Sequence, residues 1–543
     1  MSKLTYAVEV QLWNVSAYST TWTDITADVI MPGLTCSSGT TGTTIKDRVS
    51  EVGTCSFDLN NSESNSAKLA GYYSPGHANA RAGYDIGCPL RVRFTFEGLT
   101  RTKWYGRIYG IAVEPGTKLS RRTRVTAFDW MHQANKYTLK LPSYETNKRA
   151  DEALLMFVKD VPVQPLSLSF DSGNTTFPII FDNVDYRTTA MAEFQKLATS
   201  EIGWVSTKHN LISDEVLTFL NYVNASARIA DFYTLPDSTS GKALNEDATS
   251  LLNEDGSNLL LDQTSHQSFD DTQFELAYSY GNKLYNHVSV TTYPRNVNNT
   301  VGVLFTMTEP VMIAAGATVD WLSVVYKDPD GRAISVCAKD IVPVVATTDY
   351  LFNTAADGTG TNITSDLAVT GIYGVNNTEF TFTNNNASDG YITFLQIRGK
   401  AIYLYDKVTR IAENEASIAQ YGLSEFEYEM KYQPPPLTAQ TIANVILSNY
   451  GSIQNQTVGE TLANNPNAEL ITYSTRSDDF VQRFLCIDCN SIVNVLETQS
   501  AIEGTYSVRG WSFEVIGNNG TTGLSINETL HLFRCENSTS WIS

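Results

Sequence analysis

Apolar and polar residues alternate along much of this chain, and that alternation most constrains the fold. It is clearest over 6–12 and 90–97. Successive side chains of a strand point to opposite faces, so alternation predicts strands with one face packed and the other toward solvent or a partner. Runs over 104–111 and 124–130, around a Pro-Gly turn at 115–116, predict a further hairpin of the same sheet. Residues 1–135 are therefore predicted to form a β-barrel or sandwich.

The period then changes to that of a helix. Apolar residues recur at helical spacing over 147–160, until Val161-Pro162 interrupts the pattern, and again over 191–198. Strand character resumes after Gly203. We expect residues 136–209 to form a small α+β insertion and 210–235 to complete the first β-barrel.

An acidic eight-residue repeat occupies 244–267, with the copies LNEDATSL, LNEDGSNL and LLDQTSHQ. Three short copies are too few for a solenoid, and the Glu-Asp-Gly step favours a turn. Residues 236–267 are therefore predicted to be an exposed hairpin. A calcium loop remains an alternative, although the carboxylate spacing matches no known template.

The second half of the chain also alternates between strand blocks and insertions. Turn-rich, strand-like residues over 300–397 predict an inserted β-sandwich. After the prolines at 434–436, apolar residues at helical spacing predict a helix. The predicted second β block comprises 268–299, 398–433 and the α+β region 434–543. The predicted fold class is thus mainly β with small α+β insertions.

Size, composition and charge limit the possible classes. A chain of 543 residues corresponds to about three or four domains. Hydrophobic residues make up 42% and charged residues 18%, which excludes a disordered chain. A net charge of −20 disfavours stable binding to nucleic acid. No secretion signal or run of about 18 apolar residues is present, so we expect cytoplasmic synthesis, no stable membrane insertion and mostly reduced thiols.

Motifs of the large enzyme classes are missing. We find no H-E-x-x-H, G-x-S-x-G or Walker-type loop, and no G-x-G-x-x-G between a strand and a helix. We therefore predict no catalytic residues, no cofactor and no enzymatic activity. Two opposed carboxylates would suffice for a glycosidase, so a hydrolase remains an alternative. Zinc binding by Cys486, Cys489, His531 and Cys535 also remains open, against the alternative of buried or paired thiols.

Charge is unevenly distributed along the sequence. Residues 81–124 hold ten basic and three acidic residues, a local charge of +7. Residues 231–275 hold ten acidic residues and Lys242, a local charge of −9. These segments are either two solvated faces or complementary surfaces that meet between subunits. Under the second interpretation, the candidate subunit-interface residues are Arg121, Arg122 and Arg124.

Several segments resemble tail-tip proteins of long-tailed bacteriophages, the baseplate-hub or minor tail proteins. In the first part of the chain they are WTDIT at 22–26, VSEVGTCSFDLNN at 49–61, YSPG at 73–76, GCPLRVR at 87–93 and WYGRI at 104–108. Later segments are YNHVSV at 285–290, LQIRGK at 395–400, SIAQYG at 417–422 and the predicted helix at 439–450. Together they extend over most of the chain in order.

The resemblance implies a structural virion protein at the tail tip. In such a homotrimer each chain contributes two hub-type β-barrels, so that three chains form a tube with pseudo-sixfold symmetry. The implied partners are the distal tail and tail tube proteins, the tape measure protein, and tail fibre or receptor-binding proteins. Double-stranded DNA would only pass through the lumen during genome delivery. The alternatives are a tail-tip hydrolase acting on cell wall or surface polysaccharide, and a host-carbohydrate-binding module formed by the sandwich.

Overall fold

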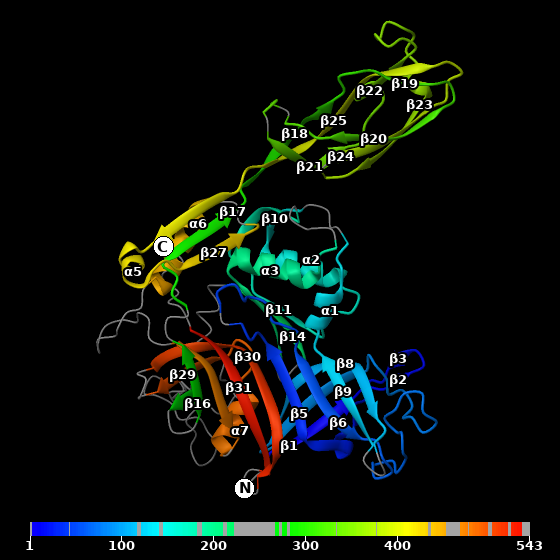
Figure 1. Ribbon diagram of the computed structural model, residues 1–543. Helices are drawn as coiled ribbons and strands as arrows, with labels where there is room; N and C mark the ends of the chain where they lie inside the picture. Colours follow the sequence, from blue (N-terminus) through cyan, green and yellow to red (C-terminus); the bar gives the residue numbers. More distant parts are fainter. Residues whose placement is uncertain are drawn as a thin grey trace, which may run out of the picture.

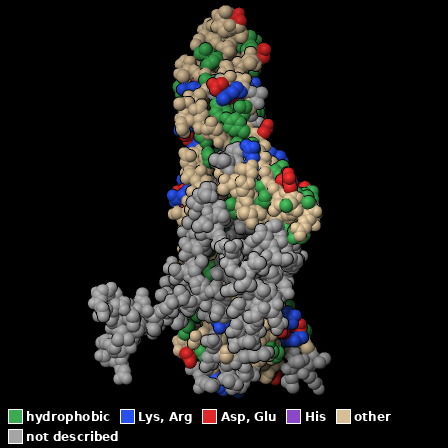
Figure 2. Space-filling model, turned by 90° about the vertical axis from the view of Figure 1, so that its left-hand side faces the viewer, with side chains coloured by type: hydrophobic (Ala, Val, Ile, Leu, Met, Phe, Trp, Pro, Cys, Tyr) green, Lys and Arg blue, Asp and Glu red, His purple; other side chains and the backbone are tan. Residues whose placement is uncertain are grey.

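A computed structural model of the chain shows an elongated, mainly β molecule (Figure 1). One large sheet forms the body, helices and small sheets lie next to it, and the sandwich stands at the far end in both views (Figure 1) (Figure 2). None of the described helices is long and apolar enough to cross a membrane. The structure describes residues 3–42, 44–116, 121–140, 145–181, 187–209, 214–221, 267–270, 274–279, 283–328, 330–332, 334–375, 377–432, 436–451, 467–475, 477–497, 502–519 and 523–534.

The body is a 13-stranded sheet built from both ends of the chain. Its path runs β16-β28-β31-β30-β5-β6-β9-β8-β7-β1-β4, and β29 joins β15 to β30 beside it. Within the described residues the path is open, with β16 and β4 at its ends. The strands are β1 (Thr5–Val10), β4 (Thr23–Asp24), β5 (Val29–Gly39), β6 (Thr54–Asn60), β7 (Pro89–Phe96), β8 (Leu99–Glu114), β9 (Arg122–Phe128), β15 (Gln267–Asp270), β16 (Glu275–Ser279), β28 (Asn467–Ser474), β29 (Ile492–Glu497), β30 (Ile502–Asn519) and β31 (Gly523–Arg534).

Strand β5 joins the two ends of the chain. It pairs with β30 on one side, from Gly510↔Gly39 to Glu514↔Thr35, and with β6 on the other. The sequence pattern predicts that 268–299, 398–433 and 434–543 form one second β block. Instead, β28–β31 continue the N-terminal sheet, whereas the strands within 398–433 belong to other sheets. Alternation identifies the buried face of a strand but not its neighbour, so the sequence did not reveal this pairing.

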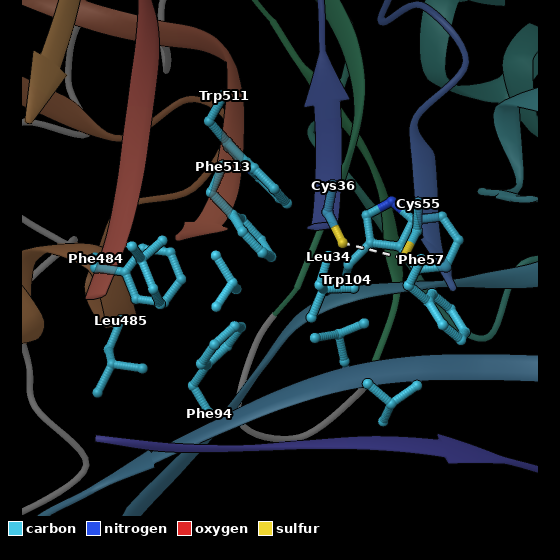
Figure 3. Close-up of a cluster of buried hydrophobic side chains, with 14 of the residues drawn as sticks. Leu34, Cys36, Cys55, Phe57, Phe94, Trp104, Phe484, Leu485, Trp511 and Phe513 are labelled. Atoms are coloured by element: carbon cyan, nitrogen blue, oxygen red, sulfur yellow. Dashed lines mark hydrogen bonds between the residues drawn. The ribbon is translucent and has the colours of Figure 1, made fainter. Parts of the chain in front are cut away.

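Aromatic side chains from both ends of the chain fill the core of this sheet (Figure 3). The ring of Phe94 meets Phe484 and Phe513 edge-on, with centroids 4.9 and 5.5 Å apart. Phe484 belongs to α7 (Asp478–Cys486). Trp104 is fully buried and donates its indole N–H to the Ser37 carbonyl at 3.2 Å. The core thus bridges the N-terminal and C-terminal strands.

The predicted α+β insertion, 136–209, contains the two expected helices, α2 and α3. Residues 216–220, predicted to help complete the first β-barrel, instead pair with strands of this insertion in a small separate sheet. Thr189 caps α3 by accepting a hydrogen bond from the Ala192 N–H. The apolar faces of the helices pack in a separate core with strands of two small sheets. The elements are α1 (Met131–Lys136), β10 (Glu145–Arg149), α2 (Ala150–Asp160), β11 (Leu168–Phe170), β12 (Thr176–Ile180), α3 (Ala190–Glu201), β13 (Trp204–Lys208) and β14 (Val216–Leu220).

A three-stranded sheet, β26-β17-β27, lies beside the helices (Figure 1). The predicted helix after the prolines is present as α6 and packs on this sheet. On β27 the glutamates are exposed, while Phe426, Tyr428 and Met430 are buried. The elements are β17 (His287–Thr292), β26 (Val408–Glu413), α5 (Glu415–Tyr421), β27 (Glu425–Met430) and α6 (Pro436–Tyr450).

The inserted sandwich consists of two sheets that share one core. Phe380 and Phe382 from one sheet pack with Phe352, Ile392 and Ile397 from the other. One sheet contains β18 (Arg295–Thr306), β19 (Val311–Ile313), β21 (Ser335–Val342), β22 (Tyr350–Asn353) and β25 (Gly390–Leu404); the other contains β20 (Thr318–Val325), β23 (Leu367–Tyr373) and β24 (Asn377–Asn384). Short elements elsewhere are β2 (Trp13–Asn14), β3 (Ala17–Tyr18), η1 (Thr26–Asp28) and η3 (Thr364–Asp366).

Truncating Phe94 tests whether the two ends of the chain form one cooperative unit. We expect Phe94→Ala to destabilise the large sheet by about 3 to 5 kcal/mol, because it removes a buried ring and leaves a cavity. Hydrogen exchange measured by mass spectrometry should then show lost protection in both β7 and β30. Phe382→Ala, the matched change in the sandwich core, should loosen β24 and leave β7 and β30 protected. Loss confined to β7 would contradict a shared unit.

Candidate assembly interface

The predicted interface arginines lie at the outer face of the large sheet. Arg122 and Arg124 project from β9 and are half-exposed, and Arg121 directly precedes the strand. Arg122 contacts Glu114 at 2.6 Å and Asp58 at 3.3 Å. Arg124 contacts the same Asp58 at 3.0 Å. The structure therefore brings two of the three residues into a network with acidic side chains of their own chain.

Strand register explains this network. β9 lies between β6 and β8, with Arg124 opposite Asp58 and Arg122 opposite Glu114. Opposite side chains on one face of an antiparallel pair are close enough to interact. Two guanidinium groups and two carboxylates form the network, so its formal charges balance. Exposed ion pairs of this kind contribute little stability, so the arginines would lose little free energy on exchanging partners.

A partly exposed aromatic group lies farther along β8 and β9 than the arginines and was not singled out from the sequence. Tyr109 is 53% exposed, and its ring centroid lies 4.9 Å from Phe128 and 4.8 Å from His132. Phe128 ends the strand that carries Arg122 and Arg124. A bulge between Ile108 and Gly110 breaks the alternation of β8 at this point, so the sequence pattern does not show that Tyr109 is exposed. Aromatic rings beside arginines are typical of protein interfaces.

The wider basic segment 81–124 is not a uniform positive patch. Arg91 contacts Glu9 at 2.6 Å and Asp214 at 2.7 Å, and Arg93 contacts Glu9 at 3.6 Å. These carboxylates are distant in sequence, so a local charge count could not include them. The acidic segment 231–275 lies outside the described residues, apart from 267–270 and 274–275. The complementarity of the two segments therefore stays a prediction.

Lys103, another member of the basic segment, is buried at the junction between the two ends of the chain. Its ammonium donates to the Ile487 carbonyl at 2.8 Å and to Glu528 Oε1 at 3.1 Å. It also lies 4.6 Å from the centroid of the Phe484 ring. Tyr473 donates its hydroxyl to the other carboxylate oxygen of Glu528. Each charged group is thus satisfied within the core, which makes Lys103 a structural rather than an interface residue.

Two buried carboxylates mark the junction between the large sheet and the α+β insertion. Asp129 accepts hydrogen bonds from the Met131 N–H at 3.1 Å and the Thr207 hydroxyl at 3.0 Å. Glu215 accepts from the Trp130 N–H at 3.1 Å. Burial raises the pKa of Asp129 to about 7. Burial, and next the charge of Asp129, raise the pKa of Glu215 to about 8.

The described residues give no support to the two metal sites that the sequence left open, a zinc site near Cys486 and a calcium loop in the octad repeat. Cys489 is fully buried, and Cys486 is partly buried at the end of α7. Burial raises the pKa of both thiols. No group of three or more potential ligands suited to a metal ion occurs in the described part of the chain. Cys535 and nearly all of the octad repeat lie outside the described residues.

Segments that carry the tail-protein resemblance meet within the large sheet. Gly87 donates its N–H to the Ile108 carbonyl at 2.6 Å, and Ile108 donates to Cys88 at 3.0 Å. Gly106 passes so close to Phe128 that an added Cβ would lie 2.2 Å from its carbonyl oxygen. The motifs at 87–93 and 104–108 thus form one hydrogen-bonded unit, in which a glycine is required.

Three of the later segments, 285–290, 417–422 and 439–450, meet near Asn286. Its side-chain amide, fully buried, donates to the Gly422 carbonyl at 2.7 Å, and its amide oxygen accepts the Ser424 N–H at 2.7 Å. The preceding Tyr285 donates its N–H to Tyr450 at the end of α6 at 2.8 Å. Motifs more than a hundred residues apart in sequence are therefore joined by one buried side chain, a role that its sequence context did not reveal.

The buried carboxylates predict a pH-dependent stability. Because the folded state raises both pKa values above about 4, it binds protons more tightly than the unfolded chain. Asp129 and Glu215 therefore contribute most to the free energy of unfolding below pH 4, and this contribution is lost as the pH rises through 7 and 8. In the wild type, the urea concentration at the midpoint of unfolding should fall between about pH 4 and 8. We expect this fall to be smaller in Glu215→Gln. Exposed Glu427→Gln should keep the wild-type slope, and an unchanged slope in Glu215→Gln would refute the assignment.

Comparisons with known proteins find similarity in structure only. No family model and no curated protein matches this chain. A tail protein from Neisseria meningitidis MC58 matches 97% of this chain and 96% of its own, with 8% identity and a TM-score of 0.41. The 43 kDa tail protein of prophage MuSo2 from Shewanella oneidensis matches 97% and 98%, with 6% identity and a TM-score of 0.43.

A third structure is a component of the Escherichia coli type VI secretion system, described as structurally similar to the T4 bacteriophage tail proteins gp27 and gp5. It matches 94% of this chain and 76% of its own, with 7% identity and a TM-score of 0.33. Each of these three alignments covers at least 94% of this chain, at 8% identity or less.

Proposed function

We propose that this chain is a structural virion protein, a tail-tip or baseplate hub that joins the tail tube to the fibre or receptor-binding apparatus. The observation that carries the proposal is the convergence of the hub-like sequence segments. Segments at 87–93 and 104–108 share backbone hydrogen bonds, and those at 285–290, 417–422 and 439–450 meet around Asn286. Chance resemblances scattered along a chain would have no reason to form common structural units.

The large sheet supports assembly with further copies. Its end strands β4 and β16 each pair with one neighbour in the described residues. Edge strands with unpaired backbone groups are normally covered or paired. In a homotrimer, neighbouring copies would cover such edges, and the outer face with Tyr109 and the arginines would contact the next subunit. The two-barrel tube implied by the resemblance belongs to this proposal, with the β5–β30 pairing holding its two parts together.

The proposed role of the assembly is a channel for genome delivery. The chain carries a net charge of −20, so an acidic lumen would repel phosphate and let double-stranded DNA pass without sticking. Tail tube, tape measure and fibre or receptor-binding proteins are the proposed partners, and the virion tail tip is the proposed location. No bond is made or broken in this role, so we propose that the protein is not an enzyme.

The sandwich offers a second candidate function, contact with host carbohydrate. It projects from the far end of the molecule, where a receptor-binding module would be accessible (Figure 1). Hydrophobic side chains lie among charged ones on the face shown in Figure 2. The exposed hydrophobic residues of this domain include Val301, Val303, Met312, Val325, Val345 and Ile372.

Mass measurement of the purified chain tests the hub. We expect three copies around an axis, seen by light scattering in solution and as a threefold ring with a central hole in particle images. The acidic lumen should give no retention of double-stranded DNA at physiological salt. A chain that stays monomeric with its tail partners would refute the hub, and clearing of a bacterial cell-wall suspension would favour the hydrolase instead.

Charge reversal tests the interface residues. We expect Arg121→Glu/Arg122→Glu/Arg124→Glu to reduce the trimer fraction more at low salt than at high salt, because ions screen surface charges over about 10 Å at 0.1 M. The matched control is Lys327→Glu/Arg332→Glu/Lys400→Glu in the sandwich, where Arg332 and Lys400 also pair with acids of their own chain. Circular dichroism confirms folding of both variants. Equal trimer fractions in the two would assign the arginines to a solvated face.

A further inference from the structure

Two cysteines face each other in the core of the large sheet. Cys36 on β5 and Cys55 on β6 are opposite residues of the antiparallel pair, and their sulfur atoms are 3.1 Å apart. Both side chains are buried. Figure 3 shows the two thiols pointing toward each other beside Leu34, Trp104 and Phe57.

Hydroxyl pairs on either side keep these cysteines in register. Thr35 Oγ1 lies 2.9 Å from Ser56 Oγ, and Ser37 Oγ lies 2.9 Å from Thr54 Oγ1, both on the opposite face of the strands. A one-residue slip would break both contacts and turn the cysteines outward. The sulfur atoms need to approach by only about 1 Å to reach the length of a disulfide bond, about 2.05 Å.

We propose that Cys36 and Cys55 form a disulfide bond that links β5 to β6 in the mature protein. The oxidant is a small-molecule disulfide such as oxidised glutathione. One protein thiolate attacks it and releases one glutathione thiolate, which leaves a mixed disulfide. The second protein thiolate then displaces the remaining glutathione. The two protein thiols lose two protons and two electrons, and the oxidant becomes two reduced glutathione molecules.

The timing of this oxidation follows from burial. Burial raises the pKa of the Cys36 thiol well above its usual range, and the thiolate is the attacking species. The bond therefore forms while the sheet is folding or when β5 and β6 separate, not in the closed core. Its biological setting rests on the proposed function, because a virion protein leaves the reducing cytoplasm. For this pair, the inference replaces the expectation of reduced thiols.

The position of the bond gives it a structural consequence. β5 is the strand that pairs with β30 and so joins the two ends of the chain. A link from β5 to β6 would hold this joining strand in the N-terminal part of the sheet when its hydrogen bonds open. It would also constrain the unfolded chain, which is the main way in which disulfides stabilise proteins.

The experiment uses the full-length chain, unfolded and refolded with a mixture of oxidised and reduced glutathione, then denatured, alkylated without reductant and digested with trypsin. Cleavage after Lys46 and Arg48 separates the cysteines into peptides 4–46 and 49–68. Mass spectrometry should find these peptides linked, two hydrogens lighter than their sum, and separate after reduction. Alkylation of both thiols in the oxidised sample, or a link from Cys36 to another cysteine, would overturn the proposal.

Variants and stability provide matched controls. Cys55→Ser should abolish the link and leave Cys36 alkylated, whereas Cys88→Ser, which changes a buried thiol that bonds to the Gly83 carbonyl, should keep it. Oxidised wild type should unfold at a higher urea concentration than reduced wild type. Equal unfolding midpoints would contradict the proposed stabilisation by the disulfide. If Cys55→Ser does not fold, the peptide map of the wild type still shows whether Cys36 and Cys55 are linked. A monomer that forms the bond would refute the hub alone, and a trimer without it would refute the disulfide alone.

Discussion

Strand β5 pairs with β30 and so brings residues more than 470 positions apart into one sheet. The chain entropy lost in closing that loop is offset by the burial of apolar side chains. The aromatic contacts of Phe94 with Phe484 and Phe513 supply that burial. Without this pairing, the N-terminal strands would lose the C-terminal side chains that share their core.

Buried polar groups occur where segments distant in sequence meet. Lys103 and Glu528 join the two ends of the chain, and Asp129 and Glu215 lie where the sheet meets the α+β insertion. Asn286, which directly precedes β17, bonds to the end of α5 and to the residue before β27. Such groups contribute little net stability, since burial costs them their hydration. Their hydrogen bonds are satisfied in one arrangement, which favours a single way of docking these parts.

The outer face of the sheet shows why charge along a sequence is a poor guide to a surface. Arg122 and Arg124 come from a basic stretch, yet Asp58 and Glu114 balance them across neighbouring strands. The proposed interface therefore depends on geometry as much as on charge: exposed Tyr109 and partly buried Phe128 add an aromatic surface on the same two strands as the ion pairs. That combination suits recognition of another copy better than a uniform positive field would.

The kinds of element and much of their order can be predicted from local sequence patterns. Alternation predicts β1 and β7, helical spacing predicts α2, α3 and α6, and turn-rich strands predict the sandwich, because these patterns depend on residues close in the chain. Which strands become neighbours is known only from the folded chain. The β5–β30 pairing, the partners of Arg124, and the facing thiols of Cys36 and Cys55 all depend on register between distant segments. A local pattern fixes the face of a side chain but carries no information about what lies across from it.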